Sequence, residues 1–320
     1  MKTNQIIKNK NILITGGAGF LGNNLTERLL KYKPKKITIF SRNQKVQFNM
    51  EKKFPECNYI VGDVEDYHGL RNAIRGQDII IHLAFFKYVP QAETFVREVC
   101  KTGVIGSMNL VDAVLDEKNV EICLGISTDK VTNAVGVYGS AKSLMERLWW
   151  QAHNNKGSIK TKFITCRYGN VAASSGSVIQ LWKEKAENNQ PLPVTVPTMT
   201  RFFFTIDEAV DLIEYTIENA NSGEIISQEM NACLLGDLAE VMSKGKVKVE
   251  IIGKRPGEKL DECLIAYYEM PHTLKKGNKF IIKPYSNINK NPDMDQFTSD
   301  KAYRMNKEEI KQVLMKIGWY

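Results

Sequence analysis

Residues 11–22 read Asn11-Ile-Leu-Ile-Thr15-Gly16-Gly-Ala-Gly19-Phe-Leu-Gly22, and this stretch decides the fold. The apolar run predicts a β-strand, and a helical pattern follows directly, so the glycines fall at a strand-to-helix turn. A dinucleotide-binding motif requires this context: the first glycine allows the tight turn, the second lets a pyrophosphate approach the backbone, and the third lets helix and strand pack closely. The alternative is a glycine turn that serves only to pack the helix against the strand. The expected cofactor contacts here are Thr15, Gly16, Gly19, Phe20, Leu21 and Gly22.

The remainder of the first 170 residues repeats this alternation of short apolar runs and amphipathic stretches. Such a pattern predicts an α/β fold of the Rossmann type, a doubly wound parallel sheet with helices on both faces. The predicted strands are Asn11–Thr15, Lys36–Phe40, Asn58–Val61, Asp78–Leu83, Val120–Ser127 and Phe163–Tyr168. The predicted helices are Gly22–Lys31, Tyr67–Ile74, a long one near Ala92–Glu117, and Gly139–His153.

The regular alternation ends after Gly169, where Ser/Gly-rich and Pro-rich pieces follow. We therefore expect residues 1–170 to form the nucleotide-binding domain, with a helix at 206–219 returning to it. Residues 171–205 and 220–320 are expected to form a smaller, discontinuous substrate-binding region.

Composition narrows the class of protein. The chain has 320 residues, of which 43% are hydrophobic and 25% charged, which excludes intrinsic disorder, a collagen and a disulfide miniprotein. It contains no run of 18 apolar residues and no signal-peptide core, so we expect a cytoplasmic protein without a membrane partner. Its six cysteines lack a CxxC pair and its four histidines are scattered. We therefore expect a reducing compartment and no metal site.

The formal net charge is +8, and most of the excess lies in residues 241–320. An anionic partner would explain this excess, but the lysines are interleaved with acids and form no run of five like charges. A solvated surface is favoured over a nucleic-acid patch, and no groove-reading motif is present.

The residues after the second predicted strand indicate which dinucleotide binds. NAD-preferring proteins often place a carboxylate there, whereas this chain has Ser41 and Arg42. A hydroxyl and a guanidinium suit a 2′-phosphate, so NADP is favoured over NAD; in the alternative, Arg42 only covers the adenine. Asp63, followed by Val64, could meet the adenine amino group or serve as an ordinary turn residue. The strand end at Leu83 and Ala84 completes the expected cofactor contacts.

Residues 127–142 hold the candidate catalytic group. Tyr138 and Lys142 are four apart at the start of a predicted helix and therefore share one face. A lysine beside a phenol lowers the pKa of the phenol, which can then take a proton from a sugar hydroxyl during hydride transfer. Thr128, at the end of the preceding strand, can supply a companion hydroxyl.

On these motifs the chain resembles the extended short-chain dehydrogenase/reductases, and specifically the soluble UDP-N-acetylglucosamine 4,6-dehydratases, including C5-inverting ones of pseudaminic acid synthesis. The resemblance extends over nearly the whole chain. Beyond the glycine turn and residues 127–142, it includes Lys87–Pro90 with Glu93, Arg167–Val171, Gly176–Val178, Met199–Phe202 and Gly253–Lys259.

The resemblance implies oxidation at C4 of a nucleotide sugar with NADP, loss of water across C5 and C6, and return of hydride to C6. Tyr138 would take the O4 proton, Asp129 would protonate the departing C6 hydroxyl, and Lys130, held neutral by desolvation, would remove the C5 proton. If the family resemblance is set aside, the alternative is that Asp129 and Lys130 form only a surface ion pair.

The resemblance also implies the substrate contacts and the assembly. Arg201 and Arg255 would bind the diphosphate, Glu258 the uridine ribose, and Asn170 the sugar-diphosphate backbone. Lys87 would line the sugar pocket or remain exposed. UDP-GlcNAc is the expected substrate, and a homo-oligomer, either a dimer or a hexamer, is the expected assembly.

Several residues depart from the family pattern. Gly103 stands where the family has an asparagine that holds a proton-relay water, and the other departures near the sugar pocket are Phe85, Phe86, Tyr88, Ala134, Ala173 and Ser175. They leave open a different sugar or nucleotide base. Two further readings also stay open: a nucleotide-sugar 4-epimerase or ketoreductase, which needs no Asp129–Lys130 pair, and a catalytically silent NADP-binding sensor.

Overall fold

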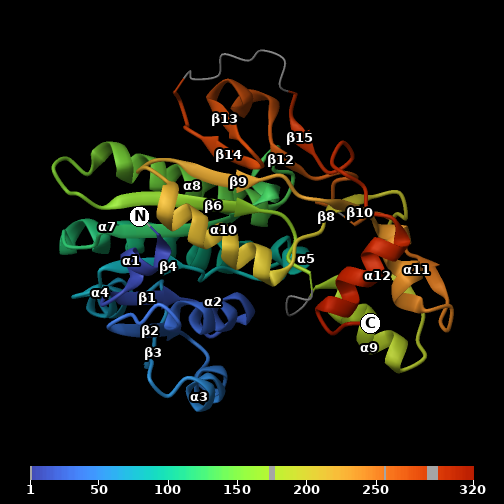
Figure 1. The fold of residues 1–320 in the computed structure, drawn as a ribbon, viewed down its shortest axis with the longest axis horizontal. Coiled ribbons are helices and arrows are strands. Elements are labelled where there is room, and N and C mark those ends of the chain that lie inside the picture. The colour runs from blue at the N-terminus through green and yellow to red at the C-terminus, as the bar shows by residue number, and fades with distance from the viewer. Residues whose placement is uncertain (1, 173–176, 256, 287–294) are drawn as a thin grey trace.

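The computed structural model describes residues 2–172, 177–255, 257–286 and 295–320 (Figure 1). The family departures at Ala173 and Ser175 lie outside these ranges. Within the described ranges, no helix combines the length and the apolarity needed to cross a membrane.

A nine-stranded sheet forms the centre of the molecule, in the order β13-β14-β9-β6-β5-β4-β1-β2-β3. The six strands predicted from the sequence are neighbours in it and run parallel, which confirms the doubly wound fold. Their bounds differ little from those predicted: β1 Asn11–Thr15, β2 Lys36–Ser41, β3 Asn58–Val61, β4 Ile79–His82, β5 Ile122–Thr128 and β6 Lys162–Tyr168.

Three further strands extend this sheet at the β6 edge. β9 (Ile225–Gln228) runs parallel to β6, and the antiparallel hairpin of β13 (Thr273–Lys276) and β14 (Lys279–Ile282) follows it. These strands come from the part of the chain that was expected to lie in the smaller region. The division of the chain into two regions stays a prediction.

Helices cover both faces of the sheet. On one face, Leu25 and Leu29 of α2 (Phe20–Leu30) pack in the same core as Leu212 and Ile213 of α10 (Ile206–Asn219). The core of the other face is made by α4 (Tyr67–Ile74), α7 (Gly106–Glu117) and α8 (Val137–Asn155), with Trp149 at its centre. Before β3, two helices were not predicted, α1 (Thr3–Ile7) and α3 (Gln44–Lys53), because α1 is a single short turn and α3 buries only Gln47 and Met50.

The long helix predicted near 92–117 is interrupted. The structure has α5 (Val89–Ala92), α6 (Val96–Val99), a π-helical segment at Cys100–Ile105, and then α7. Gly103 lies inside the π-helical segment, and its carbonyl accepts a hydrogen bond from the Ser107 hydroxyl at 2.5 Å. A π-helical turn re-aims the side chains around it, and such turns are frequent at functional sites.

A second core lies beside the sheet, where Figure 1 shows α9, α11 and α12 grouped together. Trp182, Leu192, Leu238 and Leu314 are among its buried residues. Its helices are α9 (Val178–Glu187), α11 (Leu235–Ser243) and α12 (Lys307–Lys316), and its strands are β7 (Leu192–Val194), β8 (Thr200–Phe202), β10 (Ala232–Leu234) and β11 (Val249–Ile251). β12 (Cys263–Ile265) pairs with β15 (Phe297–Thr298), and short 3₁₀ turns follow β5 and β12 at Asp129–Val131 and Tyr267–His272.

A buried ion cluster joins distant parts of the chain. Arg167 on β6 is 1% exposed, and it forms ion pairs with Glu146 on α8 at 2.7 Å and with Glu269, after β12, at 2.8 Å. Both pairs are forked, because two nitrogens of the guanidinium donate to the two oxygens of each carboxylate. Removing one partner of such a cluster leaves a buried charge uncompensated, which is strongly destabilising.

Candidate active site

A cavity of about 710 Å³ opens where β1, β4, β5 and β6 end, between the sheet and the second core. Ligands of doubly wound folds bind outside the carboxyl ends of the strands. The predicted site residues that line this cavity are Gly16, Gly19, Phe20, Leu21, Gly22, Ser41, Arg42, Asp63, Val64, Leu83, Ala84, Lys87, Thr128, Lys130, Tyr138, Lys142, Asn170, Arg201, Arg255 and Glu258. Thr15 and Asp129 lie behind the wall, since both are fully buried.

The glycine turn has the tight geometry that its sequence predicts. Gly16 has a φ of +67°, and a Cβ there would lie 2.6 Å from the backbone nitrogen of Ala84. A Cβ at Gly22 would lie 2.0 Å from the carbonyl oxygen of Gly17, so this glycine allows the helix to approach the turn. Thr15 supports the turn from behind through a 2.8 Å hydrogen bond between its hydroxyl and His82 Nδ1.

The N-terminus of α2 is suited to an anion. Gly19 is its N-cap and has no side chain, so the cap residue makes no side-chain hydrogen bond to the first backbone N–H groups of the helix. Gly19 and Phe20 line the cavity. Free N–H groups together with the positive end of the helix dipole bind phosphate groups, so the turn fits the pyrophosphate of a dinucleotide.

The predicted 2′-phosphate site contains an ion pair that the sequence did not indicate. Arg42 Nη1 lies 3.3 Å from Asp63 Oδ2, and the arginine side chain is 58% exposed. Behind them, buried Gln47 donates hydrogen bonds to the Ser41 hydroxyl and to the carbonyl of Ile60. The guanidinium is thus held at the cavity edge, with Asp63 as its partner.

Tyr138 and Lys142 start α8 as predicted, and burial shifts the pKa of both. Lys142 Nζ donates to the carbonyl of Ile126 at 2.6 Å and lies 3.9 Å from the centre of the Phe85 ring. Burial lowers the pKa of Lys142 to about 7. Burial also raises the pKa of Tyr138 to about 12, and the nearby charge that opposes this rise is that of Lys130. In this structure the phenol pKa is therefore raised, and the lowering expected from Lys142 once a nicotinamide lies beside the pair stays a prediction.

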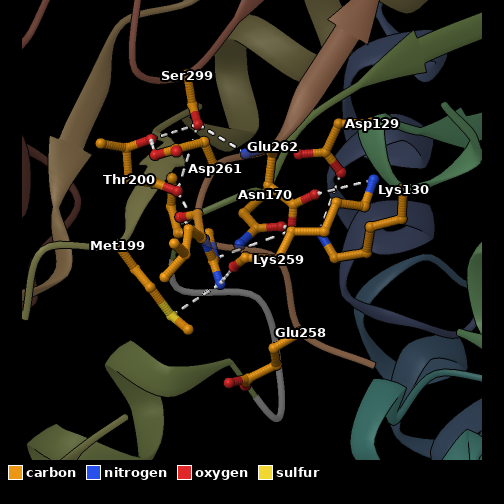
Figure 2. Close-up of polar contacts among 12 residues, drawn as sticks. Asp129, Lys130, Asn170, Met199, Thr200, Glu258, Lys259, Asp261, Glu262 and Ser299 are labelled. Atoms are coloured by element: carbon orange, nitrogen blue, oxygen red, sulfur yellow. Dashed lines mark hydrogen bonds and ion pairs between the residues drawn. The ribbon is translucent and has the colours of Figure 1, made fainter. Parts of the chain in front are cut away.

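Lys130 is surrounded by acceptors, as Figure 2 shows. Its Nζ lies 3.0 Å from Asp129 Oδ1, 2.8 Å from Asn170 Oδ1 and 3.3 Å from Glu262 Oε1. Burial acts to lower the pKa of Lys130, but the attraction of the two carboxylates outweighs it and the pKa is raised. The expectation that desolvation keeps this lysine neutral is therefore wrong for this structure.

The pKa of Asp129 is raised, as expected of a residue that acts as a proton donor. Burial raises its pKa, and repulsion from Glu262 adds to the rise against the attraction of Lys130. The Thr128 hydroxyl donates to Asp129 Oδ1 at 2.9 Å. Because Thr128 and Lys130 both line the cavity, they connect the buried carboxyl group to it.

Glu262 is the residue that the sequence reasoning missed. It lies directly before β12, lines the cavity, and is near Lys259 and Arg201 as well as Lys130. The only available signal was its place just after the Gly253–Lys259 motif, which does not distinguish it from the neighbouring Asp261.

Two of the predicted substrate residues, Arg201 and Glu258, lie in different surroundings. The Arg201 guanidinium donates to the carbonyls of Thr200, Lys259 and Leu260, at 2.7, 3.0 and 3.0 Å, so it fixes the loop before β12. Glu258 accepts from the backbone N–H of Arg255 at 3.3 Å and lies apart from the Lys130 cluster in Figure 2. The roles assigned to these residues stay predictions.

Lys87 is an exposed residue at the cavity wall. Burial lowers its pKa, which is consistent with a pocket-lining position.

The departures Phe85 and Gly103 are sterically linked. A Cβ at Gly103 would lie 2.6 Å from Phe85 Cζ, and the Phe85 ring meets Tyr138 edge-on with 5.5 Å between the ring centres. The phenylalanine thus occupies the space that a side chain at position 103 would need.

We expect Gly103→Ala to lower the free energy of unfolding by about 1–3 kcal/mol, because overpacking in a packed site costs this much. Phe85→Ala should remove the clash, so the double variant should lose less stability than the two single losses added together. Urea unfolding of the four proteins measures this coupling. Simple additivity would contradict the steric link.

Comparisons with known proteins agree with this geometry. The family described as "Polysaccharide biosynthesis protein" matches residues 12–284. The UDP-N-acetylglucosamine 4,6-dehydratase (inverting) of Campylobacter jejuni is 39% identical over 86% of this chain and 83% of its own length. A UDP-glucose 4-epimerase of Rickettsia bellii is 33% identical over 97% and 96%. The solved structure of Pen from Bacillus thuringiensis superposes with a TM-score of 0.92 and 31% identity, covering 97% of this chain and 98% of that one. The resemblance predicted from the motifs is confirmed.

Proposed function

Because this chain belongs to the polysaccharide biosynthesis protein family, we propose that it is a nucleotide-sugar 4,6-dehydratase that converts UDP-N-acetylglucosamine with inversion at C5. The observation that carries this proposal is the Asp129–Lys130 pair beside Tyr138. A 4-epimerase needs the tyrosine, the lysine and a cofactor, but it has no elimination step that an acid and a base would serve.

We propose NADP as the cofactor. The uncapped N-terminus of α2 and the glycine turn fit a pyrophosphate, and Arg42 at the cavity edge fits a 2′-phosphate. When bound, the nicotinamide would supply the hydride acceptor for C4 and the donor for C6.

The chain's own residues would then move the protons. Tyr138 takes the proton of O4, and Asp129 provides the proton with which the C6 hydroxyl leaves as water, reaching the cavity through Thr128 and Lys130. Lys130, at the mouth of this pair, becomes a neutral amine by passing its extra proton to the Asp129 carboxylate, and the amine then takes the C5 proton. Asn170, Arg201, Arg255, Glu258 and Lys87 are proposed to bind the nucleotide sugar.

We also propose a cellular location and an oligomeric state for this enzyme. All six cysteines are free thiols, which accords with the reducing environment of a cytoplasmic enzyme. A dimer or hexamer is proposed from the family resemblance alone, and size-exclusion chromatography with light scattering would test it.

Incubation with UDP-N-acetylglucosamine in deuterated water tests the function. We expect NMR to show a 4-keto-6-deoxy product with solvent deuterium at C5 and inverted configuration there. A product that differs from the substrate only at C4 would instead support the epimerase named among the relatives. Cofactor binding without any product would support the silent sensor.

Cofactor preference gives a separate prediction. Arg42→Ala should weaken NADP binding about ten- to hundredfold, because a charge-assisted hydrogen bond contributes about 1.5–3 kcal/mol. NAD lacks the 2′-phosphate, so its affinity should stay within about twofold and serves as the control. Fluorescence titration measures both constants without turnover. Equal losses for the two cofactors would contradict the assignment of Arg42.

A further inference from the structure

The charge balance around Lys130 is unusual for a lysine expected to act as a base. One ammonium group lies between two buried carboxylates, Asp129 and Glu262, and the Asn170 side-chain oxygen accepts from it as well. An ammonium has three hydrogens to donate, and these three acceptors match them. Arg201 and Lys259 add positive charge on the far side of Glu262, at 3.9 and 3.7 Å.

The two carboxylates are placed differently. Asp129 is fully buried and stands behind Lys130, whereas Glu262 is 5% exposed and is one of the residues that line the cavity. Glu262 Oε2 is buried and, among the described residues, has no hydrogen-bond partner. A substrate in the cavity would therefore meet Lys130 and Glu262 but not Asp129.

Glu262 is held in place from a separate part of the chain. Its backbone N–H donates to the Ser299 hydroxyl at 2.8 Å, and its carbonyl accepts from the Ser299 N–H at 2.8 Å. The Ser299 hydroxyl in turn contacts the Thr200 hydroxyl, which donates to Asp261 (Figure 2). These bonds fix the main chain of Glu262, so its carboxylate stays beside Lys130.

We infer that Glu262 is a positioning residue for Lys130: this cavity-facing carboxylate holds the lysine side chain in place and determines its protonation state when a substrate enters. The role of Lys130 as the C5 base rests on the proposed function. The interaction between Glu262 and Lys130 does not, because it is a contact within the chain itself.

Electrostatics support the geometry. The pKa of Lys130 is raised although burial alone would lower it, and the pKa of Glu262 is lowered although burial alone would raise it, because Lys130, Arg201 and Lys259 surround it. An opposite charge within about 4–6 Å typically moves a pKa by about 1–3 units. Removing Glu262 should therefore increase the fraction of neutral Lys130 at a given pH.

Acetylation of Lys130 by acetic anhydride, followed by peptide mass spectrometry, measures this fraction without any turnover. Only the neutral amine reacts, so each unit of pKa lost raises the rate at pH 9 about tenfold. We expect Glu262→Gln to react at least about tenfold faster than wild type at Lys130. An unchanged rate in a folded Glu262→Gln protein would overturn the inference.

Asp261→Asn is the matched control, because it removes the same charge one residue away, from a side chain that forms no ion pair with Lys130 in the described part of the chain. The asparagine oxygen can still accept from Thr200, so the bonds that fix the Glu262 main chain are kept. Its labelling rate should equal that of wild type; an equal increase would show a general charge effect and overturn the specific role. If Glu262→Gln does not fold, Glu262→Asp withdraws the carboxylate by one methylene and should increase the rate in the same direction, and no increase would again overturn the inference.

Activity then separates this inference from the proposed function. If the enzyme is a dehydratase, the alkaline rise of kcat/KM should level off at a pH about 1 unit or more lower in Glu262→Gln than in wild type. If Glu262→Gln is labelled faster but the wild-type protein has no dehydratase activity, the proposed function is refuted and the role of Glu262 stands. If the wild-type protein is a dehydratase but Glu262→Gln is labelled at the wild-type rate, the function stands and the role of Glu262 is refuted.

Discussion

Tyr138→Phe is expected to abolish turnover while the affinity for the nucleotide sugar stays nearly unchanged. The phenol acts on a proton in the transition state, whereas ground-state binding uses the rest of the cavity. The change should also leave the fold intact, because the Tyr138 ring keeps its edge-on contact with Phe85.

Product NMR gives the turnover, and calorimetric titration with the nucleotide sugar gives the affinity. Tyr67→Phe is a suitable control, since it removes a hydroxyl that donates to Asp116 at the surface and should retain full turnover. Substantial product from Tyr138→Phe would refute the proton transfer assigned to this tyrosine.

Lys130→Met should stop the reaction after C4 oxidation. Loss of a general base typically lowers a rate by about 10²–10⁴-fold, so water loss should fall by that amount. C4 oxidation does not need Lys130, so the absorbance of reduced cofactor at 340 nm should appear and persist. Stopped-flow absorbance and product NMR measure the two steps separately.

Lys101→Met, at an exposed ion pair with Glu98, is the control for loss of a lysine and should behave as wild type. A Lys130→Met enzyme that dehydrates at nearly the wild-type rate would show that Lys130 is structural. Lys87, at the cavity wall and with a lowered pKa, would then be the next base to test.

Features that depend on neighbouring residues were predictable from the sequence. The glycine turn needs only a strand, three glycines and a helix in order, and Tyr138 and Lys142 share a face because they are four apart on one helix. The parallel sheet follows from the alternation of strands and helices. For this part of the chain, local pattern and final structure agree.

Features that depend on contacts between distant residues were not predictable. Glu262 reaches Lys130 because Ser299 fixes its backbone and β12 pairs with β15, and neither contact has a local signature. The wrong expectation of a neutral Lys130 has the same origin, since it considered burial and one carboxylate but not the second. The lack of room for a side chain at Gly103 likewise depends on the Phe85 ring, 18 residues earlier in the sequence.

The Arg167 cluster has a consequence for the order in which the protein is completed during synthesis. Its second carboxylate, Glu269, is 102 residues further along the chain. At about 5–20 residues per second, a ribosome needs about 5–20 seconds to cover that distance. During this interval the Arg167 guanidinium can pair with Glu146 but not with Glu269. The sheet beyond β6 is also incomplete, because β9 and β14 have not both been synthesised. The amino-terminal part of the sheet, up to β6, therefore has an unpaired edge at first. That edge is covered only after the carboxyl-terminal segment with β13 and β14 has been synthesised.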